Sequence, residues 1–141
     1  MSWAIGTKAQ LAQLQATVNF ADTGPGRARV LIYTTPRVAP GAEPGAVPQV
    51  DVELAKPCGT IVGGGLQLHP ANLSGSMVMA TGIPLWGRWM SASGEFIADG
   101  DVTDADHGGD LQIIGGQTPE GGSSPLLYAG SLVVVGDMIL S

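Results

Sequence analysis

The residues best suited to chemistry lie in one acidic stretch in the second half of the chain. Six carboxylates and a histidine fall within sixteen residues: Glu95, Asp99, Asp101, Asp104, Asp106, Asp110 and His107. A flexible loop dense in carboxylates can hold Ca²⁺, which takes about six to eight oxygen ligands. The spacing does not follow the EF-hand loop, because no Gly at the sixth position is followed by Glu at the twelfth. The sequence therefore favours a solvated acidic loop over a structural cation site.

A hydrolase built on Asp99, Asp101 and His107 is the catalytic alternative. It requires a deep pocket in which one carboxyl group has a raised pKa, whereas this polar stretch predicts a flat, exposed loop. The histidines, His69 and His107, lack zinc-site spacing, and Cys58 is the only cysteine. The sequence contains no nucleophile elbow, phosphate-binding loop or dinucleotide fingerprint. We therefore expect no enzyme, no cofactor and no metal.

Glu95 and Asp99 lie within a predicted β-hairpin, residues 85–100, around which the chain is organised, and the other carboxylates follow it. Side chains alternate along a strand, so Trp86, Arg88 and Met90 should share one face, opposite Gly87 and Trp89. The polar residues 91–94 end in a glycine and form the loop, and residues 99–100 should make a second turn. Trp86, Arg88 and Trp89 could form an aromatic platform for a sugar, but packing in the core with a cation–π contact is the preferred interpretation.

Composition limits the classes of partner. The chain has 141 residues, enough for one domain with a core, and is 44% hydrophobic but only 13% charged. Its net charge of -6 argues against nucleic acid and against an anionic membrane surface. The apolar run 132–135 is too short to span a bilayer, and residues 1–6 lack the basic region of a signal peptide. With one cysteine, no disulfide within the chain ties the fold to an oxidising compartment. The low charge suggests that apolar surface meets other protein.

Two segments without periodic pattern are candidates for contact with a partner. Residues 1–6 are predicted to be an arm that docks on the body or reaches a neighbour. Residues 36–48 carry a proline at every fourth position and favour extended polyproline geometry. This loop is interpreted either as a surface contact loop or as a floppy connector. The candidate partner-binding residues are Trp3, Ile5, Val38, Pro40, Pro44 and Val47.

A helix is predicted over about residues 8–21, with Thr7 as its N-cap. Leu11, Leu14 and Val18 form a narrow apolar stripe on it. We expect a helix laid across a sheet, with a helix that bridges subunits as the alternative. The turn residues 22–26 should end it.

The rest of the chain, within a single domain over residues 7–141, predicts a mainly β fold. The strands expected outside the hairpin are 27–35, 49–54, 60–62, 66–68, 76–81, 110–114, 126–129 and 132–140, the last bulged at 136–137. A turn is expected at 56–59, and a bulge or close backbone approach at the glycine triplet 63–65. Eight or nine short antiparallel strands with one helix indicate a β-sandwich or a jelly-roll-like body.

Three sets of residues, in the same order along the chain, resemble a family of small structural proteins of tailed bacteriophages and prophages. The first set is the Ala/Gln/Leu-type helix with residues 24–26 and the strand 29–33. The second runs from Trp86 and Arg88 through Gly94 to residues 98–102. The third comprises residues 110–113, residues 129–130 and the final strand. Gly87, where a bulkier residue is usual, and the proline-rich loop depart from the pattern.

The resemblance implies a virion structural protein and no enzyme. Within that class it favours a capsid decoration (cement) protein, which binds the major capsid protein lattice and copies of itself, as a trimer or a dimer. It would be made in the host bacterial cytoplasm and end on the capsid surface of the virion. A tail-tube, neck or baseplate component is the nearest alternative. A carbohydrate-binding β-sandwich is the second.

Overall fold

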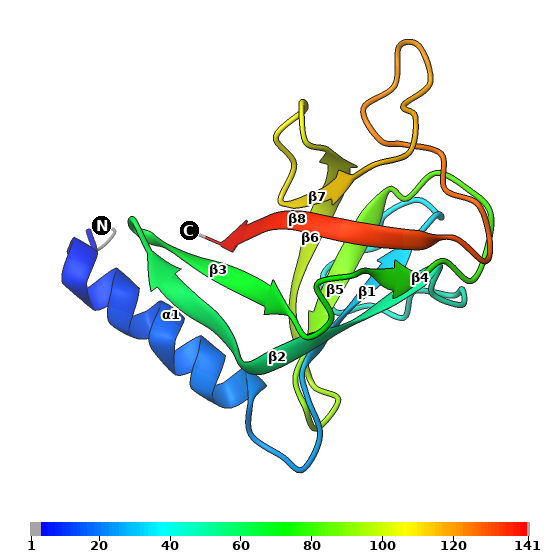
Figure 1. The fold of residues 1–141 in the computed structure, drawn as a ribbon. Coiled ribbons are helices and arrows are strands. Elements are labelled where there is room, and N and C mark those ends of the chain that lie inside the picture. The colour runs from blue at the N-terminus through cyan, green and yellow to red at the C-terminus, as the bar shows by residue number, and fades with distance from the viewer. Residues whose placement is uncertain (1–3, 141) are drawn as a thin grey trace.

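The strands form one sheet that closes on itself as a barrel (Figure 1). The computed structural model describes residues 4–140. Seven strands follow one another in the order β3-β2-β1-β5-β6-β7-β8, and β8 then pairs with β3 to complete the ring. The short strand β4 pairs with the other end of β8. The elements are α1 (Thr7–Ala21), β1 (Arg29–Tyr33), β2 (Val50–Val62), β3 (Gly65–Pro70), β4 (Ser76–Met77), β5 (Trp86–Met90), β6 (Phe96–Asp104), β7 (Leu111–Ile114) and β8 (Leu132–Leu140).

The mainly β class with one helix is confirmed, but the sheet does not form the expected sandwich or jelly roll. A sandwich packs two sheets face to face, whereas here one sheet curls until its first and last strands meet. The expected antiparallel pairing holds for the named strands except β6 and β7, which run parallel with Val102 opposite Leu111. Residues 105–110 connect the two strands, returning the chain to the level of Val102, and include Gly108 at a φ of +65°.

The turn expected at residues 56–59 is wrong, because β2 continues through it as a bulge. The register with β3 shifts between Leu54 and Gly59. Pro57 has no N–H to donate to a ladder, so the pairing is interrupted there while the strand direction persists. The bulge lets the first half of β2 pair with β1 and the second half pair with β3.

Two glycine-based expectations are also wrong. Residues 99–100 do not turn: Gly100 lies opposite Gly87 inside the β5–β6 ladder, and β6 runs on to Asp104. A Cβ on Gly100 would stand 2.8 Å from Cβ of Asp110, so glycine is needed for close approach of the next loop. The triplet 63–65 holds a two-residue hairpin turn instead of a bulge, since Val62 pairs with Gly65 across Gly63 and Gly64 at positive φ.

Two of the predicted strands are shorter or absent. Only Ser76 and Met77 of residues 76–81 form a strand, and residues 126–129 form isolated bridges to Gly82 and Gln117. The hairpin of β5 and β6, the strands β1 and β7, and β8 with its bulge near 136–137 agree with the prediction.

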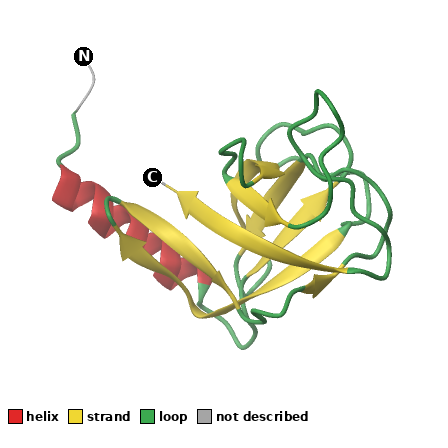
Figure 2. Ribbon diagram, turned by 45° about the horizontal axis from the view of Figure 1, so that its top comes forward, coloured by secondary structure: helices red, strands yellow, loops and turns green. Residues whose placement is uncertain are grey.

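Helix α1 packs against β2 and β3, along one side of the barrel (Figure 2). Its buried residues Leu14, Val18 and Ala21 join the inward-facing strand residues in one continuous core. The predicted helix is thus confirmed, as is its position across the sheet. The predicted N-cap is wrong, because Gly6 occupies that position and Thr7 lies in the first turn.

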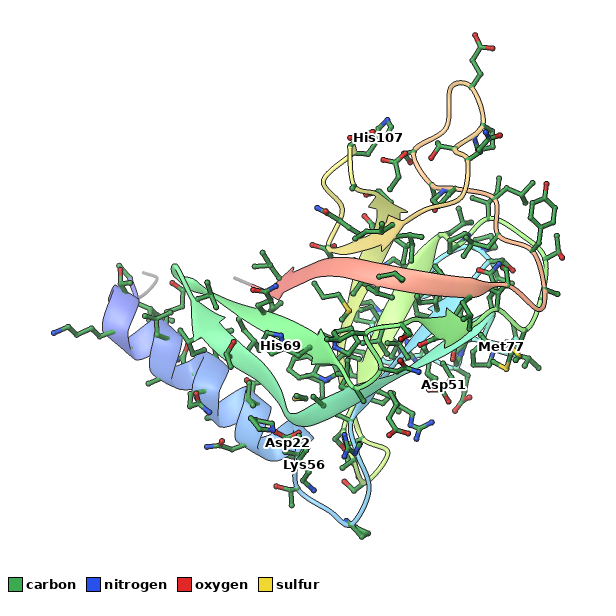
Figure 3. All side chains as sticks on the ribbon, viewed as in Figure 1. Asp22, Asp51, Lys56, His69, Met77 and His107 are labelled. Atoms are coloured by element: carbon green, nitrogen blue, oxygen red, sulfur yellow. The ribbon has the colours of Figure 1, made fainter. Side chains whose placement is uncertain are left out.

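A polar junction ties the end of α1 to the bulge of β2 (Figure 3). The carboxylate of Asp22 accepts hydrogen bonds from the backbone N–H of Cys58 at 3.0 and 3.2 Å. Nζ of Lys56 donates to the carbonyls of Gly24 and Gly26 at 2.9 and 3.2 Å. Burial of the thiol, followed by the charge of Asp22, raises the pKa of Cys58 to about 12 from an ordinary value of 9.0.

Cys58 should therefore resist alkylation in the folded protein. At pH 8, a pKa of about 12 instead of 9.0 reduces the thiolate fraction of Cys58 about a thousandfold. Burial also limits access of the reagent. We expect iodoacetamide to label the native protein at least about a thousand times more slowly than the urea-unfolded chain, measured by mass spectrometry. Equal rates for the two states would contradict the buried junction.

Candidate protein-binding surface

An uncovered apolar surface crosses the outer face of three strands at one end of the barrel. We define the apolar strip as Met77, Met79, Leu132, Val134 and Ile114. Met77 pairs directly with Leu132, and Val134 pairs directly with Ile114. Leu132 and Val134 are two residues apart and share a face, so the side chains form a continuous row. Met77, Leu132 and Ile114 are 61%, 64% and 53% exposed, which is unusual for neighbouring large apolar side chains.

The apolar strip is flanked by two depressions. Ile114, Tyr128 and Leu132 line a groove of about 850 Å³ between residues 114–120 and 126–133. Leu73 and Val134 line a smaller one on the other side of β8. Leu73 and Tyr128 are themselves exposed, so the apolar surface extends beyond the strip. Figure 3 places Met77 at the end of the molecule away from the start of α1.

A second apolar sector of the barrel's outer face, on β1, β5 and β6, is covered by the chain itself. The rings of Tyr33 and Trp86 stack there with centroids 4.6 Å apart. The guanidinium of Arg88 lies 5.3 Å from the ring of Trp86 and 5.0 Å from that of Phe96. Residues 36–48, which we call the strap, pass over this sector. The expected face of Trp86 and Arg88 is thus confirmed, and Gly87 and Trp89 line the barrel interior.

A buried ion pair fastens the strap. Nε and Nη2 of Arg88 donate to the carboxylate of Asp99 at 2.7 and 3.1 Å, and Nη1 donates to the carbonyl of Ala42 at 2.7 Å. The side chains of Arg88 and Asp99 are 6% and 1% exposed. The hydrogen bonds to Asp99 raise the pKa of Arg88 further above its ordinary value. The guanidinium therefore joins β5, β6 and the strap in one unit.

Two further residues of the strap, Arg37 and Gly41, hold it in place. Arg37 donates to the carboxylate of Asp101 at 2.8 Å and to the carbonyl of Asp99 at 3.1 Å. Gly41, at a φ of +76°, lies against the ring of Phe96, where an added Cβ would be 3.5 Å from the ring. These contacts argue against the floppy connector, and the alternative of a surface contact loop stays a prediction.

The predicted partner-binding residues differ in exposure. Ile5, Pro40 and Val47 are exposed, Val47 by 84%, and Val38 and Pro44 are half-buried. Trp3 lies outside the described residues. Partner binding by these residues stays a prediction.

The aromatic sugar platform is not supported. Trp86 is fully buried under the strap and Trp89 is 4% exposed, so neither indole offers a face to a sugar. The preferred interpretation, core packing with a cation–π contact, agrees with the structure.

The acidic stretch is divided among separate partners. Asp99 pairs with Arg88, Asp101 pairs with Arg37, and Asp110 accepts a hydrogen bond from the backbone N–H of Asp101 at 3.0 Å. His107 instead contacts Asp104, so the hydrolase combination of Asp99, Asp101 and His107 is not assembled. Among the side chains that the structure describes, which exclude that of Asp137, no three from His, Cys, Asp or Glu gather in a way that could hold a metal ion.

Asp104 organises the loop after β6. Its carboxylate accepts hydrogen bonds from the hydroxyl of Thr118 at 2.5 Å and from the backbone N–H of Asp106 at 3.0 Å, and it lies 2.6 Å from Nδ1 of His107. The hydrogen bond from Thr118, followed by that with His107, lowers the pKa of Asp104 below its ordinary value of 3.8.

His69 lies on β3, away from His107 (Figure 3). Within the described part of the chain, no helix is long and apolar enough to cross a membrane.

Sequence reasoning missed the apolar strip, although a signal for it exists. Residues 132–135 are four consecutive apolar residues in a predicted strand, and Met77, Val78 and Met79 are three more. Consecutive apolar residues in a strand indicate that both faces of the strand are covered by other parts of the protein. Here the inward face, with Val133 and Val135, is covered, and the outward face is not.

Comparisons of this chain with protein-family models, with curated proteins and with solved structures each found no match.

Breaking the buried ion pair should strongly destabilise the protein. Arg88→Met leaves Asp99 as an uncompensated buried charge, which costs about 3–5 kcal/mol of unfolding free energy in urea melts. The matched control is Arg37→Met, which breaks the exposed pair with Asp101 and should cost about 1 kcal/mol or less. Equal losses for the two variants would show that the buried pair does not fasten the strap.

The pKa of Asp104 should depend on Thr118 more than on His107. We expect the Asp104 carboxyl to titrate below 3.8 in the folded protein, by carbon-detected NMR, and to move upward in Thr118→Val more than in His107→Gln. Because the folded-state pKa is lowered, these bonds stabilise the fold above the unfolded-state pKa and lose that effect as pH falls through the folded-state value. Asp104→Asn should therefore lower Tm at pH 7, with a difference that shrinks on acidification. A difference independent of pH would refute this assignment.

Proposed function

We propose that this protein is a structural component of a bacteriophage virion, and specifically a capsid decoration protein. It binds the major capsid protein lattice and copies of itself, as a trimer or a dimer, on the capsid surface. The observation that carries the proposal is the apolar strip: one apolar outer sector of the barrel is covered by the strap, and the other lies open. The sequence resemblance to small phage structural proteins supports the same class.

The placement of exposed residues fits a protein with more than one neighbour. Ile5 precedes α1 and is 57% exposed, while β4 and the start of β8, which carry Met77 and Leu132 of the apolar strip, lie at the other end of the molecule (Figures 1 and 2). Two apolar contacts at opposite ends suit a repeated lattice, where many modest contacts add up through multivalency. The same features support a tail-tube, neck or baseplate component, which is the second candidate.

A charge on the apolar strip should weaken attachment without unfolding the protein. Leu132→Asp places a carboxylate on an exposed position, so Tm should change little, whereas burial of that charge at an interface should weaken binding about tenfold or more. Binding is measured by adding the purified variant to particles that lack this protein. Gln67→Asp, on the outer face of β3, is the matched control and should bind like the wild type.

Cryo-electron microscopy of the same particles separates the two candidates. Density on the capsid surface, with capsids that break more easily when the protein is absent, supports decoration. Intact capsids without tails support the tail, neck or baseplate candidate.

If Leu132→Asp attaches to the particles as well as the wild type does, the apolar strip is not part of the interface.

A further inference from the structure

A small apolar cavity opens from the inside of the barrel, separate from the apolar strip. It has a volume of about 100 Å³ and is lined by residues of six strands. Its walls include Val30, Leu68, Trp89, Leu111 and Met138. These walls face a space large enough for more than one water-sized group.

Short side chains on the inner face of β5 and β6 shape this space. Gly87 and Gly100 lie opposite each other in the ladder and let Leu111 and Asp110 approach the sheet closely. Ala98 lies opposite Trp89 and contributes only a methyl group to the wall. A longer side chain at position 98 would occupy the cavity.

Trp89, one of the lining residues, has a side-chain donor without an acceptor. Trp89 is 4% exposed, and among the described side chains, those of residues 4–140 other than Asp137, no atom accepts a hydrogen bond from its Nε1–H. A buried donor without a partner costs free energy, so such groups are nearly always satisfied by protein, water or ligand. The same is true of Nε1 of Trp86, which lies outside the cavity.

We propose that this cavity binds a small neutral molecule with an apolar body and one hydrogen-bond acceptor, which pairs with Nε1–H of Trp89. The size follows from the volume, because an apolar cavity of about 150 Å³ holds benzene and this one is smaller. The occupant therefore has roughly five non-hydrogen atoms. Asp110, which is exposed and lines the cavity, disfavours an anion. The proposal does not depend on the virion function.

The test uses the full, nitrogen-labelled chain and two probes of four carbons each, 2-butanone and butyrate. We expect 2-butanone to shift the indole N–H signal of Trp89 saturably at millimolar concentration. Butyrate should leave the signal in place, and the Trp86 indole should not respond to either probe. Absence of a saturable shift with 2-butanone overturns the proposal. A contact from the Trp89 indole to an internal water that 2-butanone does not displace overturns it as well.

Two variants make the assignment specific. Ala98→Leu fills the cavity and should abolish the response, with Ala98→Val as the smaller replacement if the first does not fold. Trp89→Phe removes the donor while keeping most of the ring, and should weaken binding about fivefold, followed at the methyl signal of Met138. Ile114→Ala, on the outer surface, should bind like the wild type. An unchanged response in both Ala98 variants overturns the site.

Discussion

The structure depends on the closure of the sheet by β8. Along its length this strand pairs with β7 on one side, and with β4 near its start and β3 near its end on the other. A strand that pairs on both sides leaves no free edge there, so the barrel satisfies backbone groups that an open sheet would expose to other chains. The closure also encloses the core, because the inward residues Val133, Val135 and Met138 pack against the strands opposite. Closure of the sheet therefore determines which side chains of each strand face the core and which face the outer surface.

Once the ring is closed, its outer face is treated in two different ways. Over β1, β5 and β6 the strap covers an aromatic cluster and is fixed by a guanidinium that is itself buried. Over β4, β8 and β7 the apolar side chains remain at the surface. Covering apolar area with one's own chain stabilises an isolated subunit, whereas leaving it open favours association. The contrast between the two sectors is the structural basis for proposing an assembly function.

The sequence predicted the local elements where a pattern had one physical cause. The alternation around Val50 and Val52, the stripe through Leu14 and Val18, and the loop ending in Gly94 each specified an element that the structure contains. Closure could not be predicted in the same way, since it depends on the pairing of β3 with β8, whose residues lie more than seventy positions apart in the chain. The predicted turns at Pro57 and Gly100 were wrong for a related reason. Both residue types are typical of turns, but pairing with neighbouring strands keeps them within strands. Pro57 lies in a bulge, and Gly100 lies at a close approach of the next loop. The carboxylates were judged by their spacing, whereas their partners, Arg88, Arg37 and Thr118, come from other segments.

One attachment of the strap uses a main-chain atom of the strap, and this affects how freely its sequence can diverge. Arg88 binds the carbonyl of Ala42, so this contact requires no particular side chain at position 42, whereas the contacts with Asp101 and Asp99 require Arg37. Exchanges at outward positions such as Pro40 or Val47 would alter what the loop presents to a neighbour while its path over the barrel persists. If the strap contacts a partner as proposed, its outward residues can change without loss of the fold.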